Sequence, residues 1–533
     1  MGGFSSECRK MKPRAKSGAV VGCCAAAAML SGAAAMAADG VTLVAYSGLF
    51  AFANDEKIAN DFHHGHEKTP PKMSPEAAPI PFDTGMFGPD PTYADTPYDP
   101  KAQLDIYGAK YQKPTQRPLL ELGRELYNSG PFQPMANVLG DKNPLAPHLY
   151  VYGDWRTAIA YNDNGARETA LIATRLNLDV DFGITGTERI HAFFRPFDKN
   201  GSFNRVEIGG DGDDESEFDL DGNVDALFFE GDIGAMWGGF TNTRNTFDLP
   251  FAIGLIPLLF QNGVWVEDAF TGFAVTIPAQ NSPELYISNF DVTFFAGFDK
   301  VTSGAVPGAD SAVQLFGVTA FLEMLEGYVE LGYGYTQDNS GFDGSYHNIT
   351  GAFTRRYGGW LSNSVRVIAN FGQDPDGGAA QTADGVLILI ENSLVTHLPS
   401  TLVPYFNFFA GFDRPQSLAR DAGAGGVLKN TGINFETDGL TGFPKMTDDG
   451  HDAVGLALGI QYLFDLDKQV VFEVAAQNRD GDAGSPGGNE VGVGVRVQLP
   501  INNAMILRFD AIYAYRENTD NLAGIRFEYR WKF

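Results

Sequence analysis

Charged side chains recur at every second position of the C-terminal segment. In the stretch 521–533 (NLAGIRFEYRWKF), charged residues occupy the even positions from Arg526 to Lys532, and aliphatic or aromatic residues occupy the odd positions from Ile525 to Phe533. A period of two places all the charges on one face of a β-strand. Guanidinium and carboxylate groups on one wall orient water and dipolar solutes and set ion preference. The chemistry indicated is therefore contact with passing polar solutes.

The same parity identifies charged positions in the other alternating segments, which we predict to line a lumen. The candidate lumen-lining residues are Arg175, Asp179, Asp181, Arg189, His191, Arg195, Glu230, Asp232, Arg496, Arg508, Asp510, Arg526, Glu528 and Arg530. The same rule gives Asp291, Glu330, Arg366, Glu473 and Lys532. A second interpretation is that these groups pair with one another and only maintain the shape of the wall. In either case, charges at membrane depth must face protein or water.

Two groups of residues have the chemistry of metal ligands. His63, His64, His66 and Glu67 combine imidazole and carboxylate ligands suited to Zn, Cu or Ni, although their spacing matches no structural zinc pattern. The alternative is a solvated tail. An acidic segment with Asp219, Asp221 and Asp225 has oxygen ligands for Ca²⁺ but lacks the full EF-loop order. Weak or adventitious metal binding is the most that these patterns predict.

The sequence contains no recognisable catalytic constellation. The histidines of the C-terminal two thirds are scattered, and no nucleophile elbow appears. All three cysteines lie at positions 8, 23 and 24, so a chain that has lost its first 37 residues has no thiolate and no c-type haem attachment site. We therefore expect no enzymatic activity and no cofactor.

The elements that position these charges are predicted to be strands. Regular alternation marks 176–184, 491–499 and 505–515, and weaker versions recur between them, which gives roughly 16 to 18 strands within 146–533. The longest apolar run, 249–260, is far below the roughly 20 residues of a transmembrane helix and contains two prolines. Closed barrels are the other structure that satisfies every backbone group in lipid. The expected fold class is an all-β, transmembrane antiparallel barrel.

Two segments precede the predicted barrel. Residues 1–37 combine a basic start, an apolar centre and a small-residue site at Ala35-Met36-Ala37, which is the pattern of a cleaved signal peptide. Residues 38–145 form a Pro-rich extension, since its recurrent prolines are incompatible with a sheet interior. Within it, Leu119, Leu122 and Leu126 share a helical face, so a short helix is expected over 118–128.

An apolar segment over 248–267 (DLPFAIGLIPLLFQNGVWVE) is interrupted by Pro250 and Pro257 and is a poor lipid-facing strand. One interpretation is an insertion that folds into the lumen and narrows it. The other is a strand followed by an apolar hairpin. The sequence leaves both open.

Composition excludes one class of partner. The chain has 38 basic and 66 acidic residues and a net charge of −28 at pH 7. Nucleic acid is excluded because phosphate binding needs the opposite sign. The acidic residues concentrate in turn-like segments such as 211–225, which is typical of solvated loops.

The aromatic last strand ending in Phe533 resembles that of the Gram-negative outer-membrane β-barrel proteins. The resemblance is porin-like in size and matches no specific family. It implies a location in the cell outer membrane as a multi-pass barrel after signal-peptide cleavage. It also implies contact with outer-membrane lipid and lipopolysaccharide, and recognition of the C-terminal strand by the barrel-assembly machinery. Association as a homotrimer is a further expectation.

The function expected from this resemblance is a porin or channel for diffusion of small polar or charged solutes. One alternative is a plugged or scaffold barrel that sheathes a periplasmic partner such as an electron carrier, which would have to supply its own haems. A less favoured alternative is an outer-membrane surface enzyme.

Overall fold

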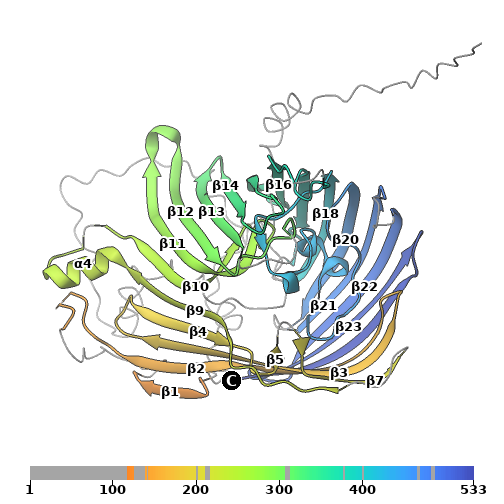
Figure 1. Ribbon diagram of the computed structural model, residues 1–533, viewed down its shortest axis with the longest axis horizontal. Helices are drawn as coiled ribbons and strands as arrows, with labels where there is room; N and C mark the ends of the chain where they lie inside the picture. Colours follow the sequence, from red (N-terminus) through yellow and green to blue (C-terminus); the bar gives the residue numbers. More distant parts are fainter. Residues whose placement is uncertain are drawn as a thin grey trace, which may run out of the picture.

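The computed structural model describes residues 117–533 apart from 125, 127–137, 141, 200–201, 211–215, 246, 307–311, 376–378, 399–400, 438, 465–467 and 482–486. The predicted signal peptide, the His63–Glu67 cluster and most of the Pro-rich extension lie outside the described residues. Eighteen antiparallel strands close into a barrel (Figure 1), which confirms the predicted fold class.

The wall strands, in chain order, are β2 (His148–Asp163), β3 (Glu168–Gly183), β4 (Arg189–Phe194), β9 (Val224–Asp232), β10 (Pro250–Phe260), β11 (Val266–Ser282), β12 (Ile287–Asp299), β13 (Val313–Met324), β14 (Gly327–Asp338), β15 (Tyr346–Tyr357), β16 (Leu361–Phe371), β17 (Val386–Leu394), β18 (Leu402–Phe412), β20 (Ala453–Phe464), β21 (Lys468–Arg479), β22 (Gly488–Pro500), β23 (Met505–Arg516) and β24 (Leu522–Lys532).

Smaller elements attach to this wall. They are β1 (Leu120–Gly123), β5 (Asp198–Lys199), β6 (Ser202–Phe203), β7 (Arg205–Gly210), β8 (Ser216–Glu217), β19 (Ala419–Arg420), the helix α4 (Ile233–Thr241) and the 3₁₀ turns η3 (Pro283–Leu285), η5 (Ala422–Ala424), η6 (Lys429–Thr431) and η7 (Ile433–Phe435). No helix among the described residues has the length and apolar character needed to cross a bilayer.

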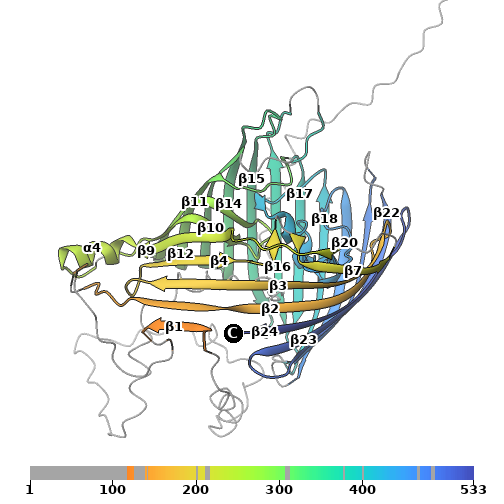
Figure 2. The same ribbon diagram turned by 60° about the horizontal axis from the view of Figure 1, so that its bottom comes forward.

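The barrel closes because its first long strand, β2, pairs with both neighbours. Trp155 of β2 lies opposite Trp531 of β24 and opposite Leu176 of β3. Closure removes the free edges that an open sheet would present. The C-terminus lies at one end of the barrel (Figure 2). The short turns between strands lie at the same end, at 184–188, 325–326, 358–360 and 501–504. We call this the short-turn end, and we call the opposite end the long-loop end.

The predicted alternation of the last strand is present in the wall. Ile525 is 56% exposed and points outward, whereas its neighbour Arg526 is only 1% exposed and points inward. Lipid favours apolar groups on the outer face, while the interior of such barrels is polar. In β24, the odd-numbered residues therefore face outward and the even-numbered residues face the lumen, as the alternation predicted.

One wall position, beside β3, is shared by two short strands, β4 and β7. The C-terminal half of β3, from Leu178, pairs with β4, whereas its N-terminal part at 169–173 pairs with β7. Between β4 and β7 the chain makes a short excursion that includes the β5–β6 hairpin. Phe203 of this excursion is buried against Leu440 and the wall.

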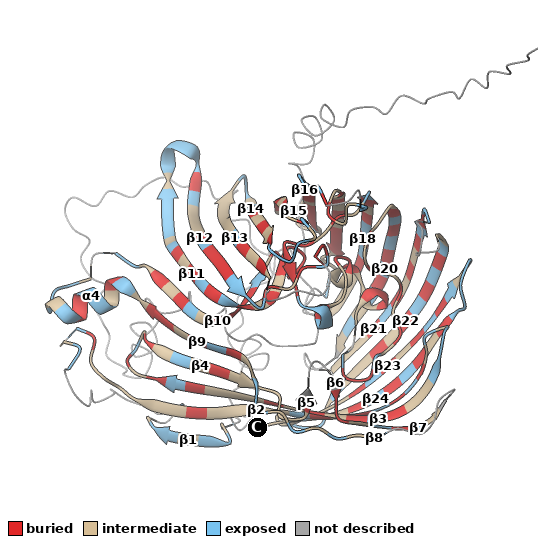
Figure 3. Ribbon diagram, in the orientation of Figure 1, coloured by how far each residue is buried: buried red, intermediate tan, exposed pale blue. Residues whose placement is uncertain are grey.

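Much of the interior is filled by chain that leaves the wall at the long-loop end (Figure 3). β10 pairs with β9 only as far as Leu255, but continues to pair with β11 as far as Phe260. The resulting segment 256–270, the inner hairpin, is mostly buried, and its residues Val266 and Glu267 pair in parallel with β19. β19 belongs to the 40-residue connection 413–452 between β18 and β20, which we call the inner loop.

The inner hairpin resolves the two interpretations of 248–267. The segment contains a strand with an apolar hairpin, and the hairpin also enters the lumen. Pro250 starts β10, where a missing N–H is tolerated, and Pro257 lies beyond the last β9 pair, on an edge that needs no donor.

The helix expected over 118–128 is wrong for its described part. Leu120–Gly123 is the strand β1, which pairs with β2 from Leu120 opposite Val151 to Gly123 opposite His148. β24 ends at Lys532, opposite Asp154, and leaves the first residues of β2 without a partner on that side. β1 supplies the missing backbone partners, and this outweighs a weak helical periodicity whose leucines stay exposed.

Candidate pore lining

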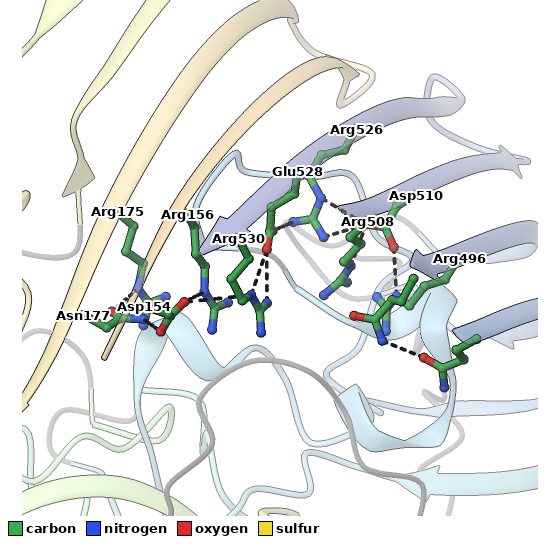
Figure 4. A network of polar contacts seen from close by, with 12 residues as sticks. Asp154, Arg156, Arg175, Asn177, Arg496, Arg508, Asp510, Arg526, Glu528 and Arg530 are labelled. Carbon is green, nitrogen blue, oxygen red and sulfur yellow. Dashed lines mark hydrogen bonds and ion pairs between the residues drawn. The ribbon is translucent and has the colours of Figure 1, made fainter. Parts of the chain in front are cut away.

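Six arginines form a row across the five adjacent strands β3, β2, β24, β23 and β22, and Figure 4 shows their side chains. We call this set, Arg175, Arg156, Arg530, Arg526, Arg508 and Arg496, the arginine row. Arg156 of β2 lies directly opposite Arg175 of β3 and opposite Arg530 of β24. Like charges in directly opposed positions destabilise a sheet, so the row needs interleaved carboxylates.

Three wall carboxylates provide this compensation. Asp154 accepts hydrogen bonds from Arg156 Nε at 2.5 Å and from Asn177 Nδ2 at 2.8 Å. Asp510 accepts from the Nε atoms of Arg496 and Arg508, both at 2.8 Å, and from Arg526 Nη2 at 2.6 Å.

The third carboxylate, Glu528, lies 3.1 Å from Arg530 Nη2 and 3.8 Å from Arg526 Nη1. Among the described residues, five of the six guanidinium groups therefore contact three wall carboxylates, so arginines outnumber carboxylates within the row. The inner loop contributes one further carboxylate, Glu436, whose Oε2 lies 2.6 Å from Arg496 Nη1.

Arg175 ends the row with incomplete hydrogen bonding. Its Nε donates to Asn177 Oδ1 at 2.7 Å, and its guanidinium carbon lies 5.0 Å from the centre of the Phe203 ring. Its Nη2 is buried and has no hydrogen-bond partner in the protein. A buried guanidinium donor without a partner carries a desolvation cost.

A cavity of about 1140 Å³ opens at the short-turn end and reaches the row at Asp154, Arg156 and Arg530. The adjoining part of its lining carries mainly acidic groups, from β3, β9 and the turn before β4. Arg189 forms ion pairs with two of these groups, Glu230 and, at 3.5 Å, Asp181. The lining therefore presents charges of both signs to whatever occupies the cavity.

At its far end the row is covered by the inner loop. A small cavity of about 20 Å³ remains between Glu436 and Phe443 of the loop and the wall residues Arg496, Arg508 and Arg526. The guanidinium carbon of Arg526 lies 5.6 Å from the centre of the Phe443 ring, a cation–π distance. The inner loop thus narrows the lumen directly above the row.

The inner hairpin narrows the lumen from another side. Trp265 is fully buried and donates from Nε1 to Asn348 Oδ1 on β15 at 2.8 Å. Gln261 Oε1 accepts from Thr350 at 2.8 Å and from Arg366 Nε on β16 at 3.2 Å. The hairpin tip therefore crosses the interior and is held by strands that are not its neighbours in the wall.

The remaining predicted residues are distributed between the cavity and the structure around it. Asp179, Asp181, Arg189, Glu230 and Asp232 line the large cavity. His191 lies 3.4 Å from Asp179. Asp232 also caps α4, because its carboxylate accepts from Ala235 N at 2.6 Å.

Arg195 lies away from the large cavity, in ion pairs with Asp198 at 3.0 Å and Asp225 at 2.5 Å. Its guanidinium also lies over the Phe203 ring. The structure therefore brings Arg175, Arg496, Arg508, Asp510, Arg526, Glu528 and Arg530 into one row, and places Arg195 in a separate ion-pair cluster.

Sequence reasoning missed the β2 members, Asp154 and Arg156, and the loop residues Glu436 and Phe443. β2 carried a usable signal, since Trp155, Ile159 and Tyr161 alternate with inward residues, although small alanines weaken the pattern. The loop residues carried none, because their place depends on how residues 413–452 fold back.

The described residues contain no group of three or more candidate metal ligands. Within the acidic segment considered for Ca²⁺, Asp225 pairs with Arg195, and Asp221 Oδ2 accepts from Asn223 Nδ2 at 2.8 Å. These carboxylates are engaged in local contacts.

Comparison with solved structures identifies the class of fold. A BenF-like porin from Pseudomonas fluorescens aligns with a TM-score of 0.50 at 12% sequence identity, over 72% of this chain and 98% of that one. The Pseudomonas aeruginosa protein OpdK, solved with vanillate, aligns with a TM-score of 0.47 at 14% identity over the same shares. This chain has the fold of the porin-like Gram-negative outer-membrane β-barrels, as its last strand indicated. No protein-family model and no curated protein sequence matches it.

Proposed function

We propose that the protein is an outer-membrane channel for passive diffusion of small polar or charged solutes, and that it favours solutes carrying an anionic group such as a carboxylate. The arginine row is the observation that carries this proposal. The fold shared with a porin supports the location in the outer membrane and the pore.

The row has the chemistry needed to guide a carboxylate. Guanidinium groups bind carboxylates through two parallel hydrogen bonds and are less strongly hydrated than ammonium groups. Successive arginines on neighbouring strands allow a solute to exchange one partner for the next, because five of the six are already partly neutralised by Asp154, Asp510 or Glu528. Binding that is favourable but shared between several sites is a condition for conduction.

The geometry also defines a route. The 1140 Å³ cavity is open to a solute at the short-turn end and exposes Arg156 and Arg530, the middle of the row. From there the row leads under the inner loop to Arg496. On this route, a solute that moves towards the long-loop end passes the inner loop.

Planar-bilayer recordings in a salt gradient test the proposal. The wild-type protein should conduct, with a reversal potential that indicates anion preference, and the Arg156→Gln/Arg530→Gln double variant should shift it towards cations. The control is Arg516→Gln, which removes an exposed arginine at the long-loop rim. Its reversal potential should remain close to that of the wild type.

Swelling of proteoliposomes in small carboxylates, sugars and amino acids gives a second readout. Carboxylates should enter fastest, and the double variant should lose this advantage while keeping sugar entry. A folded barrel that conducts no ions would contradict the channel and favour the plugged-barrel alternative. Equal selectivity in the wild type and the double variant would contradict the role of the row.

A further inference from the structure

The helix α4 buries its glycines and exposes its large side chains. Gly234, Gly238 and Gly239 are buried against the rest of the protein. A Cβ at Gly239 would lie 2.5 Å from Asn143 Cβ, and one at Gly234 would lie 1.8 Å from Phe247 O, so the helix packs closely through this face. The helix therefore packs, largely through its backbone, against the segment before β2 at Leu139 and Asn143 and against its own connection to β10 at Thr243, Asn245 and Phe247.

The outer face of α4 is apolar. Ile233, Met236, Trp237 and Phe240 follow the spacing i, i+3, i+4, i+7 and share one side of the helix. Trp237 is 60% exposed and Phe240 is 82% exposed. A helix that faces water buries such residues and exposes polar ones, so α4 has the reverse arrangement.

The position of α4 is at the edge of the apolar outer wall. It follows directly on β9 and leads through residues 242–249 into β10, at the short-turn end, and it projects beyond these strands in both views (Figures 1 and 2). On the same two strands, Leu227 and Ile253 are exposed on the outer face. The apolar face of the helix thus continues the belt that lipid would cover.

Exposed cations flank this apolar face in a chain that is acidic overall. Arg244 follows the helix C-terminus, and Lys142 adjoins Asn143, whose side chain packs on Gly239. The nearby Asp248 accepts a hydrogen bond from Asn245 at 2.9 Å. Cations beside an aromatic, uncharged helical face suit the phosphate level of a phospholipid monolayer.

We propose that α4 lies in the bilayer interface at the short-turn end, with Trp237 and Phe240 inserted at the boundary between phospholipid headgroups and acyl chains. This inference rests on the proposed membrane location of the barrel. The helix acts as a lateral anchor that fixes the depth and tilt of the wall around β9 and β10.

Depth-dependent fluorescence quenching tests the proposal on the full chain. Cys8, Cys23 and Cys24 are first replaced by Ser, and single cysteines at Phe240, Leu458 or Ser340 are labelled with an environment-sensitive dye. Leu458 lies exposed on the outer face of β20 and serves as the lipid-facing control; Ser340 lies exposed in the connection after β14 and serves as the aqueous control. The probes are vesicles of phosphatidylethanolamine and phosphatidylglycerol with brominated acyl chains, and aqueous iodide.

The label at Phe240 should be quenched by lipid brominated near the carbonyl end, more strongly than by lipid brominated near the terminal methyl, and should resist iodide. Strong iodide quenching at Phe240, together with lipid quenching at Leu458, would overturn the anchor and leave the barrel in the membrane. Loss of lipid quenching at both positions would instead refute the membrane location itself.

A second copy of the chain is the competing occupant of this face. In that case the Phe240 label would resist both quenchers, and the double variant Trp237→Ser/Phe240→Ser would reduce the mass of the detergent-solubilised particle measured by light scattering. Either result would overturn the lipid assignment. If α4 contacts lipid, the double variant keeps the wild-type mass and its conductance, because neither residue touches the pore.

Discussion

Glu473 is the residue whose replacement should most directly loosen the inner loop. It lies on the inner face of β21 and is fully buried. Its Oε1 accepts from Asn434 N at 2.9 Å, and its Oε2 accepts from Ile433 N at 3.0 Å and from the Tyr405 hydroxyl. Two backbone N–H groups and one hydroxyl therefore converge on the two carboxylate oxygens, which together have enough lone pairs to accept all three hydrogen bonds.

Glu473→Gln keeps the shape of the side chain but removes half of this acceptor. The amide oxygen of Gln can still accept a hydrogen bond from one of the two loop N–H groups. The NH₂ group of Gln faces the second N–H group and cannot accept a hydrogen bond from it. A hydrogen bond to a charged group contributes about 1.5 to 3 kcal/mol, so the docked inner loop should lose about that much. Because each ~1.4 kcal/mol is a factor of ten, the ratio of docked to undocked loop should fall by roughly 10- to 100-fold.

Single-channel recording measures this change as longer and more frequent high-conductance periods, and limited proteolysis should show faster cleavage within 413–452. Glu323→Gln is a matched control, because Glu323 faces inward from β13 and contacts Ser288 rather than the inner loop. If the folded Glu473→Gln channel shows wild-type dwell times and the same protease resistance, the inner loop is not held by this carboxylate and the reasoning fails.

Three further predictions concern the inner hairpin. Trp265→Ala removes a fully buried indole and its hydrogen bond to Asn348, so it should lower the free energy of unfolding in vesicles by about 3–5 kcal/mol and raise the single-channel conductance. A variant with wild-type conductance would show that the inner hairpin does not limit the ion current. Gly332→Ala should lower the free energy of unfolding by a smaller amount, about 1–3 kcal/mol, and also raise the conductance, because the new Cβ would lie 2.6 Å from Trp265 Cη2. Its control is Gly351→Ala, whose new Cβ would meet only Leu331, at 3.6 Å. Glu267→Gln should weaken the contacts of the inner hairpin with Lys429, at 2.9 Å, and Arg420, at 3.3 Å, in the inner loop. The open-channel current of this variant should therefore show more noise than that of the wild type. Wild-type noise would count against this coupling.

The wall could be predicted from sequence because it depends on a local rule. Alternation with a period of two gave the fold class, a strand count close to that observed and the inward parity of Arg526 and Glu528. The same rule failed where a wall strand is interrupted, as between β4 and β7, because the pattern does not show that two short strands share one neighbour. β1 was missed for a related reason, since pairing with a distant strand decided its conformation.

The contents of the lumen depend on contacts between residues far apart in the chain. Asn162 Nδ2 donates to Thr441 O at 2.7 Å, and Asn407 Nδ2 donates to Thr431 O at 2.6 Å, so polar wall residues hold the inner loop through its backbone. Backbone groups carry no sequence signature. The arginine row was therefore partly predictable, whereas the loop that covers it was not.

A weaker signal for the inner loop and hairpin does exist in the wall. Some inward positions of the strands carry glycine, and several of these glycines mark contacts with the inner loop and hairpin. A Cβ at Gly492 would lie 2.7 Å from Met446 Sδ, and a Cβ at Gly334 would lie 2.2 Å from Leu418. An empty lumen would place no such limit on side-chain size. Inward glycines that alternate with apolar outward residues, as in 491–495, therefore indicate where a barrel of this kind is filled, and inward arginines indicate where it stays open to solutes.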